Sequence, residues 1–234
     1  MKRECVKQRR EDNPSQRLAK RFSLFPSEKR SYARPPSCGD TAERDYLPSG
    51  DISLQPLPPK PVSENCEVNM EWIYEKNEDN TARYVLGTVG DNLLVCFGIN
   101  PSTAEPNNLD PTVRRVQLVA KSTGHDSFIM FNIYPQRATD PKNLHMTANM
   151  ELVNENETFL SKVVDGRRLK IWAAWGNLIE SRTYLPILKQ RIINLPGLKN
   201  AEWVKRGPLT SKGHPRHPLY SRNDWEFTVF KVLL

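Results

Sequence analysis

Apolar residues form short runs separated by polar turns, and these runs begin only after residue 70. Runs typical of strands cover residues 83–87, 92–97, 127–132, 170–175 and 202–204. The run at 92–97 does not alternate with polar residues, which is typical of a strand buried on both faces. A tight turn at Gly90-Asp91 predicts that the first two strands are neighbours.

Helical periodicity fills the segments between these runs. Asp110 followed by Pro111 is typical of an N-cap and a first-turn proline, and it predicts a helix with residues 118–120 on its apolar face. Further helices are predicted over 149–164 and over 182–193, the last one interrupted near Pro186. The alternation predicts an α/β fold, a single three-layer domain with a mostly parallel central sheet covered on both faces.

The first 69 residues follow neither pattern. They are rich in proline, and residues 1–34 hold eleven Lys/Arg against four Asp/Glu, which equals the whole net charge of +7. This composition predicts a disordered basic tail over 1–69 and a folded domain over 70–234. The tail is either a nucleic-acid contact or a solvated arm, and Met70 is an alternative start of the chain.

Several classes of protein lack support in the sequence. The four cysteines, Cys5, Cys38, Cys66 and Cys96, are too widely spaced to indicate a zinc or disulfide framework. No apolar stretch approaches the ~20 residues of a membrane helix, and no signal-peptide core follows the basic start. We therefore expect a cytoplasmic monomer with no metal and no cofactor, and with no membrane partner.

Two asparagines follow predicted strands. Asn100 lies in the turn at residues 98–103, and Asn132 ends the strand at 127–132. In a parallel sheet both amides would project from the edge where α/β proteins bind ligands, and an amide both donates and accepts hydrogen bonds. The alternatives are ordinary turn chemistry for Asn100 and a loop tie for Asn132.

A basic, proline-stiffened segment lies near the C-terminus. It contains His214 and His217 around Arg216, and Lys212 and Arg222 are close by. One imidazole could donate to developing negative charge, and the cations could hold a phosphate backbone. A metal site lacks a third ligand at a suitable spacing, and the remaining alternative is a basic surface loop.

Four segments, in order, resemble the uracil-DNA glycosylase superfamily. Gly-Ile-Asn-Pro at 98–101 is similar to its first motif, and Phe-Asn at 131–132 resembles the strand end that reads a pyrimidine. Trp-Ala-Ala-Trp-Gly at 172–176 looks like its last Trp-Gly strand, and 214–219 resembles its His-Pro-Ser-Pro-Leu loop. The resemblance implies a glycosylase-like fold that acts on a base flipped out of DNA.

The same resemblance implies roles for individual residues. Asn100 would position water, Asn132 would read the base, and His214 or His217 would stabilise the departing base; the loop has one residue more than the motif, which leaves both histidines open. Ser102 stands where strict uracil enzymes carry a bulky Tyr, which implies a wider pocket. The remaining substrate contacts would be Gly98, Pro101 and Arg137. Leu219 would be the wedge in the duplex. The charge of Arg115, Lys212 and Arg216, rather than the resemblance, makes these residues the remaining candidate DNA contacts.

The region from about Arg83 to Leu219 also resembles an uncharacterised family of bacterial and phage domains. The shared motifs are Asn-Pro-Ser-Thr, Asp-Pro-Thr-x-Arg-Arg and Gly-His-Pro-x-His-Pro-Leu-Tyr. The leading hypothesis is a nucleobase N-glycosidase acting on uracil or a modified or mismatched pyrimidine in DNA. The alternatives are a non-catalytic nucleotide or nucleic-acid binding protein, which fits the lack of a base-stacking aromatic between Ser102 and Phe128, and a hydrolase of a free nucleotide.

Overall fold

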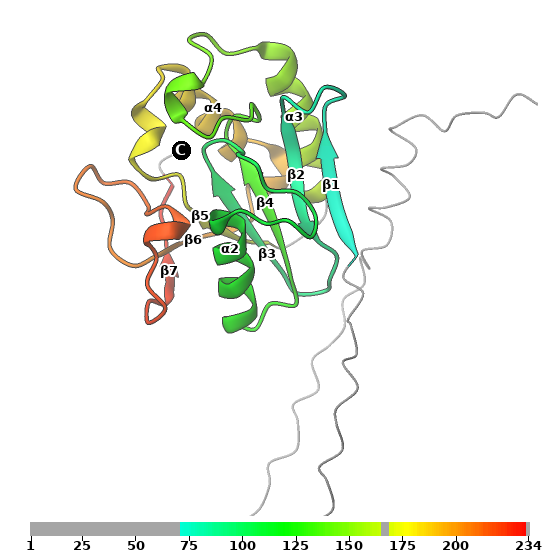
Figure 1. Ribbon diagram of the computed structural model, residues 1–234. Helices are drawn as coiled ribbons and strands as arrows, with labels where there is room; N and C mark the ends of the chain where they lie inside the picture. Colours follow the sequence, from blue (N-terminus) through cyan, green and yellow to red (C-terminus); the bar gives the residue numbers. More distant parts are fainter. Residues whose placement is uncertain (1–70, 165–168, 233–234) are drawn as a thin grey trace, which may run out of the picture. The chain divides into compact units, whose positions relative to one another are not determined.

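A computed structural model describes residues 71–164 and 169–232 of the chain, which form an α/β structure around one sheet (Figure 1). The predicted tail over 1–69 lies outside the described residues. Within these residues, no helix is long and apolar enough to cross a membrane.

In the described part of the chain, seven strands form the sheet in the order β1-β2-β4-β3-β5-β6-β7. Their bounds are Trp72–Lys76 (β1), Arg83–Thr88 (β2), Leu93–Gly98 (β3), Ser127–Asn132 (β4), Lys170–Ala173 (β5), Glu202–Arg206 (β6) and Phe227–Val229 (β7). The four strands β4, β3, β5 and β6 run parallel, whereas the pairs β1-β2, β2-β4 and β6-β7 are antiparallel. The sheet is therefore mixed, and the prediction of a mostly parallel sheet is not confirmed.

The antiparallel pairs arise at the edges of the sheet. β1 and β2 are consecutive strands joined by a short turn, and no α-helix crosses over between β6 and β7. A connection without a crossover helix returns the chain antiparallel. The expected pairing of the strands at 83–87 and 92–97 is wrong, because β4 lies between β2 and β3 and pairs with both.

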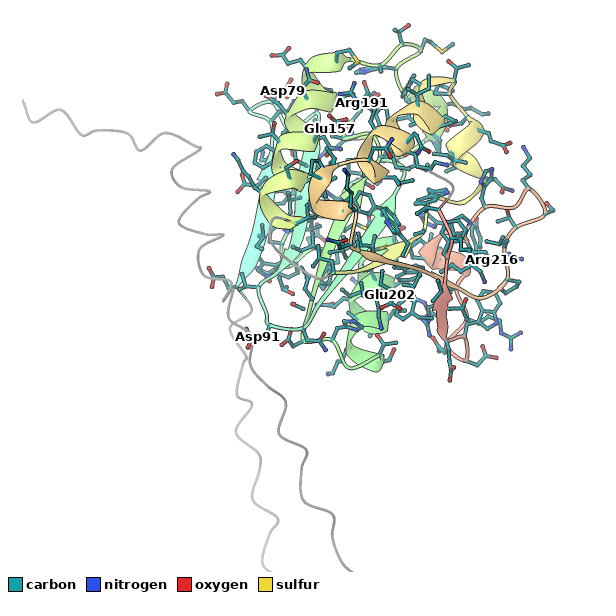
Figure 2. The ribbon with its side chains drawn as sticks, turned by 180° about the vertical axis from the view of Figure 1, so that it is seen from behind. Asp79, Asp91, Glu157, Arg191, Glu202 and Arg216 are labelled. Atoms are coloured by element: carbon teal, nitrogen blue, oxygen red, sulfur yellow. The ribbon has the colours of Figure 1, made fainter. Side chains whose placement is uncertain are left out.

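Three α-helices are present in the residues described, and they cover both faces of the sheet. They are α2 (Pro111–Ser122), α3 (Met150–Val164) and α4 (Tyr184–Ile193), accompanied by the short 3₁₀ helices η1 (Pro141–Asn143), η2 (Gly176–Glu180), η3 (Pro196–Leu198) and η4 (Pro218–Tyr220). α2 lies on one face, and α3 and α4 lie on the other (Figure 1). Seen from behind, Arg191 of α4 forms an ion pair with Glu157 of α3 at 2.8 Å (Figure 2).

The central strand β3 supplies both hydrophobic cores. Leu94 and Cys96 pack toward α2, whereas Val95 and Phe97 pack toward α3 and α4. This alternation follows from the twofold repeat of a strand, and it explains why the whole run is apolar.

The predicted helix at 111–122 begins as the sequence indicates, since the Asp110 carboxylate accepts the Val113 N–H at 2.8 Å. Leu118 was expected to face the core, but its side chain is 54% exposed. Pro186 does not interrupt α4, because it lies in the first helical turn, where a backbone N–H needs no intrahelical partner.

Candidate functional site

The backbone brings the predicted segments together at the carboxyl ends of the parallel strands. The turn after β3 is bonded to the chain after β4: Ile133 N–H donates to Gly98 O at 3.0 Å, and Ala138 N–H donates to Pro101 O at 2.9 Å. The C-terminal loop joins the end of β5, where Gly176 N–H donates to Pro215 O at 2.9 Å. The segments around Asn100, Asn132 and His217 therefore converge on one edge of the sheet.

Asn132 ends β4, and its side chain is 1% exposed. Neither its Oδ1 nor its Nδ2 has a hydrogen-bond partner among the described residues. A Cβ built on Gly98 would lie 3.0 Å from Asn132 Oδ1 and 2.6 Å from Met130 Cε, and Met130 belongs to the core beneath α2. The unpartnered amide therefore lies on the α2 face of the sheet, beside Gly98. A side chain at position 98 would press against this amide and against Met130.

Asn100 has a different environment. Its Nδ2 donates to Ala138 O at 2.7 Å and to Pro101 O at 3.0 Å, so two backbone carbonyls fix the orientation of the amide. Its Oδ1 has no protein partner in the region described, and it remains available as an acceptor. The predicted turn chemistry and a role toward water are therefore compatible in this residue.

The structure separates the two histidines. His217 caps η4 and packs beside Gly176, whose φ is +60°. Burial lowers the pKa of His217 to about 4, with Asp110 the acidic group that opposes this shift. Its Nδ1 accepts the Leu219 N–H at 3.5 Å, which leaves Nε2 to carry the hydrogen of the neutral ring. His217 can therefore donate one hydrogen bond while it remains neutral.

His214 faces elsewhere. Its Nε2 lies 2.7 Å from Glu180 Oε1, and Glu180 also pairs with Lys212. These contacts place His214 in a partly exposed ion-pair cluster. Of the two candidates, only His217 adjoins the end of β5 through Gly176.

Arg83 and Asp110 belong to this edge, although the sequence pattern does not indicate either of them as a site residue. Arg83 opens β2 and is 1% exposed, and its Nη1 donates to Ala104 O at 3.2 Å. Burial, together with the neighbouring Arg137, lowers its pKa to about 10. Asp110 lies close enough to raise the pKa of both Arg83 and His217. The one available signal in the sequence was a charged residue directly before an apolar strand.

Arg137 is largely occupied by protein groups. It donates to Ser102 O and, at 2.7 Å, to the Tyr74 hydroxyl, and it lies 3.8 Å from Glu105 Oε1. Ser102 also bonds Thr139 through its hydroxyl at 3.2 Å. These contacts hold the turn after β3 in place.

An open groove of about 840 Å³ lies along the outer side of α2. Its lining residues are Pro111, Arg114, Arg115, Leu118, Leu219, Ser221, Arg222, Asn223 and Asp224. Arg115 donates to Ser221 O and Asn223 Oδ1, which joins α2 to the segment after η4. The predicted DNA contacts Arg115 and Leu219 therefore lie in one groove, next to the His217 loop.

The other two predicted DNA contacts do not line this groove. Lys212 pairs with Glu180. Arg216, which Figure 2 labels, donates to Pro208 O at 3.1 Å. Its guanidinium lies 5.7 Å from the Trp225 ring centroid. In the described residues, no group of three His, Cys, Asp or Glu side chains is placed to hold a metal ion.

Comparison with known families matches residues 83–219 to the family described as protein of unknown function (DUF1643). The match covers more than half of the chain, so the chain belongs to this family, in agreement with the expected uncharacterised domain family. No curated protein and no solved structure matched the chain.

Proposed function

We propose that this member of the DUF1643 family is a nucleobase N-glycosidase that acts on uracil or a modified or mismatched pyrimidine in DNA. The observation that carries the proposal is the buried Asn132 amide, whose donor and acceptor are both unpartnered. A buried polar group without a partner costs about 1–3 kcal/mol, so its presence needs a compensating role. A free NH₂ group beside a free carbonyl acceptor can pair with the donor and acceptor on the edge of a pyrimidine.

The neighbouring groups supply the remaining chemistry of glycosidic cleavage. The bond between sugar carbon and base nitrogen breaks with its electron pair on the base, so negative charge develops there. The Nε2–H of His217 donates to a base oxygen and stabilises that charge. The Asn100 Oδ1 accepts from the attacking water, whose oxygen bonds the sugar carbon; a proton from that water neutralises the released base.

The groove beside α2 supports a substrate base that is part of DNA rather than of a free nucleotide. Arg114, Arg115 and Arg222 line it, and Asp224 is the one acidic residue there. Leu219 is 49% exposed and follows His217 by two residues, which suits a side chain that fills the gap left by a flipped base. Arginines along such a groove are the groups expected to contact phosphates.

The decisive experiment is Asn132→Leu in the full chain. Duplexes containing uracil, mismatched thymine or hypermodified pyrimidines are incubated with the protein and scored for abasic sites. We expect the wild-type chain to release at least one of these bases, and the variant to lose about 10²-fold or more of that rate. The variant should keep or gain free energy of unfolding, because an unpartnered buried amide is replaced by an apolar group of similar size.

Asn156→Leu is the matched control. Asn156 is also buried, and its Oδ1 has no partner in the described residues, but its Nδ2 donates to Asn132 O at 3.0 Å, so the substitution removes a made hydrogen bond. It should lower the free energy of unfolding by about 1–3 kcal/mol. Asn100→Ala should abolish release while DNA binding persists. Unchanged base release in Asn132→Leu would contradict the proposal.

A second function, nucleotide binding without hydrolysis, is favoured by Asn100. Both hydrogens of its amide are committed to backbone carbonyls, which is sufficient to explain the residue as a structural tie. Under this function, wild-type protein binds the modified duplex and forms no abasic site. The same incubations, with binding measured in parallel, distinguish the two functions.

A further inference from the structure

Arg83 and Arg206 are the buried arginines among the described residues, and each has one guanidinium nitrogen without a partner. The other two nitrogens of Arg206 donate to the backbone carbonyls of Asn223 and Trp225, whereas Arg83 has a single such contact. The Arg83 Nη1 donates to the Ala104 carbonyl at 3.2 Å, and its Nε is buried with no partner in the described ranges. By contrast, the Arg182 guanidinium donates to the backbone carbonyls of Lys142, Leu144, His145 and Ser181. Arg182 is a satisfied structural residue, whereas Arg83 keeps unused donors in the interior.

No carboxylate forms an ion pair with Arg83 in the part of the chain described. Asp110 interacts with it only at longer range, and the Asp110 carboxylate already accepts the Val113 N–H at the start of α2. Glu105 lies 3.8 Å from Arg137, the second guanidinium of this region. A buried cation without an ion-pair partner is unfavourable, and a negative charge from outside the chain would complete the site.

Arg83 and Asn132 share one face at neighbouring strands. Arg83 bonds the carbonyl of Ala104, a residue of the core beneath α2, and the Asn132 amide lies on the same face beside Gly98. β2 and β4 are paired, and Arg83 N–H donates to Pro135 O just beyond the end of β4. Two unsatisfied buried side chains therefore stand at adjacent strand ends.

We propose that Arg83 and Asn132 form an oxyanion subsite, so that the ligand read by the Asn132 amide carries a carboxylate or a phosphate that the Arg83 guanidinium binds. The planar guanidinium fork suits either group through paired N–H donors. This inference rests on the proposed function in taking Asn132 as the group that contacts the base. The charge comes either from an acidic substituent on the pyrimidine or from a nucleotide phosphate.

The test measures binding to the full chain by NMR titration with paired probes. The pair 5-carboxyuracil and 5-hydroxymethyluracil tests a charge on the base, and the pair uridine monophosphate and uridine tests a phosphate. We expect the charged member of one pair to bind at least tenfold more tightly. The pair that shows the preference identifies the source of the charge.

Variants at position 83 separate binding from folding. Arg83→Met should reduce the preference to less than about twofold, whereas Arg83→Lys should retain part of it. The midpoint of urea unfolding should stay equal or rise in Arg83→Met, because an apolar side chain replaces an unpaired charge, and should fall in the control Arg182→Met.

Three results would overturn the subsite. The first is an equal affinity for both members of each pair in the wild-type chain, and the second is a preference that survives in Arg83→Met. The third is an Arg83→Met protein as destabilised as Arg182→Met, which would make Arg83 a structural residue. Base release from DNA is measured separately: its absence together with an intact anion preference would refute the glycosidase and leave the subsite standing.

Discussion

Asn132 and Arg83 hold polar groups in the interior without satisfying them. Asn132 has both amide atoms unpartnered, and the Nε of Arg83 is in the same position. Each such group lowers the stability of the folded chain, since water would have satisfied it in the unfolded state. Residues that oppose folding in this way are expected where a ligand completes their hydrogen bonds.

At the scale of single residues, His217 makes the free energy of unfolding depend on pH. Its pKa is about 4 in the folded chain because the ring is mostly buried, against an ordinary value of 6.5. Between these values the unfolded chain binds more protons, so stability is lost as the pH falls from about 6.5 to about 4. We expect the free energy of unfolding of His217→Gln to fall on acidification by on the order of 2 kcal/mol less than that of the wild-type chain.

Urea unfolding of both proteins at pH 7 and pH 4.5 measures the difference. Burial also lowers the pKa of His125, but this residue is present in both proteins and its contribution cancels. An equal loss of stability on acidification in both proteins would show that the His217 ring does not titrate as its burial requires.

Among the elements, helix α2 is connected to the candidate site through its N-cap residue. Asp110 caps α2 and interacts electrostatically with Arg83 and His217. We expect Asp110→Asn to change the free energy of unfolding by less than about 0.5 kcal/mol, because Asn caps as well as Asp. Removal of the negative charge should raise the affinity for an anionic probe roughly threefold to tenfold.

The affinity is measured with the charged probe that the wild-type chain prefers. Asp110→Ala serves as the control for the cap, since it should cost about 1 kcal/mol of stability. Weaker anion binding by Asp110→Asn would mean that the carboxylate itself takes part in ligand contact.

The elements also show which parts of the fold a sequence can predict. The start of α2 was predicted correctly because the Asp110 cap and Pro111 act within one helical turn. The position of β4 between β2 and β3 was not, because strand order depends on contacts between distant segments. Leu118 was misassigned to the core: its apolar side chain lines the groove along α2 together with Leu219 and residues 221–224.

The candidate site, like the fold, could be predicted from the sequence only in part. The segments that carry Asn132 and His217 lie at the ends of two parallel strands, where the first contacts the turn after β3 and the second contacts Gly176 after β5; their common role stays a prediction. Arg83 was missed, since a charge at the start of a strand ordinarily faces solvent. It lies at the bulge between β1 and β2, where Glu75 pairs with Val85 and Lys76 pairs with Arg83, and such a register shift is set by pairing with a distant strand.

At the scale of the whole molecule, Cys96 reports on global opening. It lies on β3, the middle strand of the sheet, is 0% exposed, and burial raises its pKa well above the ordinary value. We expect a chain with Cys5, Cys38 and Cys66 replaced by serine to resist thiol labelling under native conditions. Its labelling should follow the population of the unfolded state as urea is added.

The measurement compares labelling with the loss of circular dichroism in the same urea series. Coincident transitions are expected, since exposure of Cys96 requires the sheet to separate from α2. Rapid labelling in the absence of urea would show that this face opens locally.

The groups that converge on the strand ends are far apart along the chain, with Arg83 on β2 and His217 beyond β6. A ligand held between them would bind only the assembled sheet, so each tenfold excess over its dissociation constant would add about 1.4 kcal/mol to the folded state. The melting temperature should therefore rise with the correct compound and stay constant with others. A thermal-shift screen of nucleobases and nucleotides can in this way identify the natural ligand before any reaction is known.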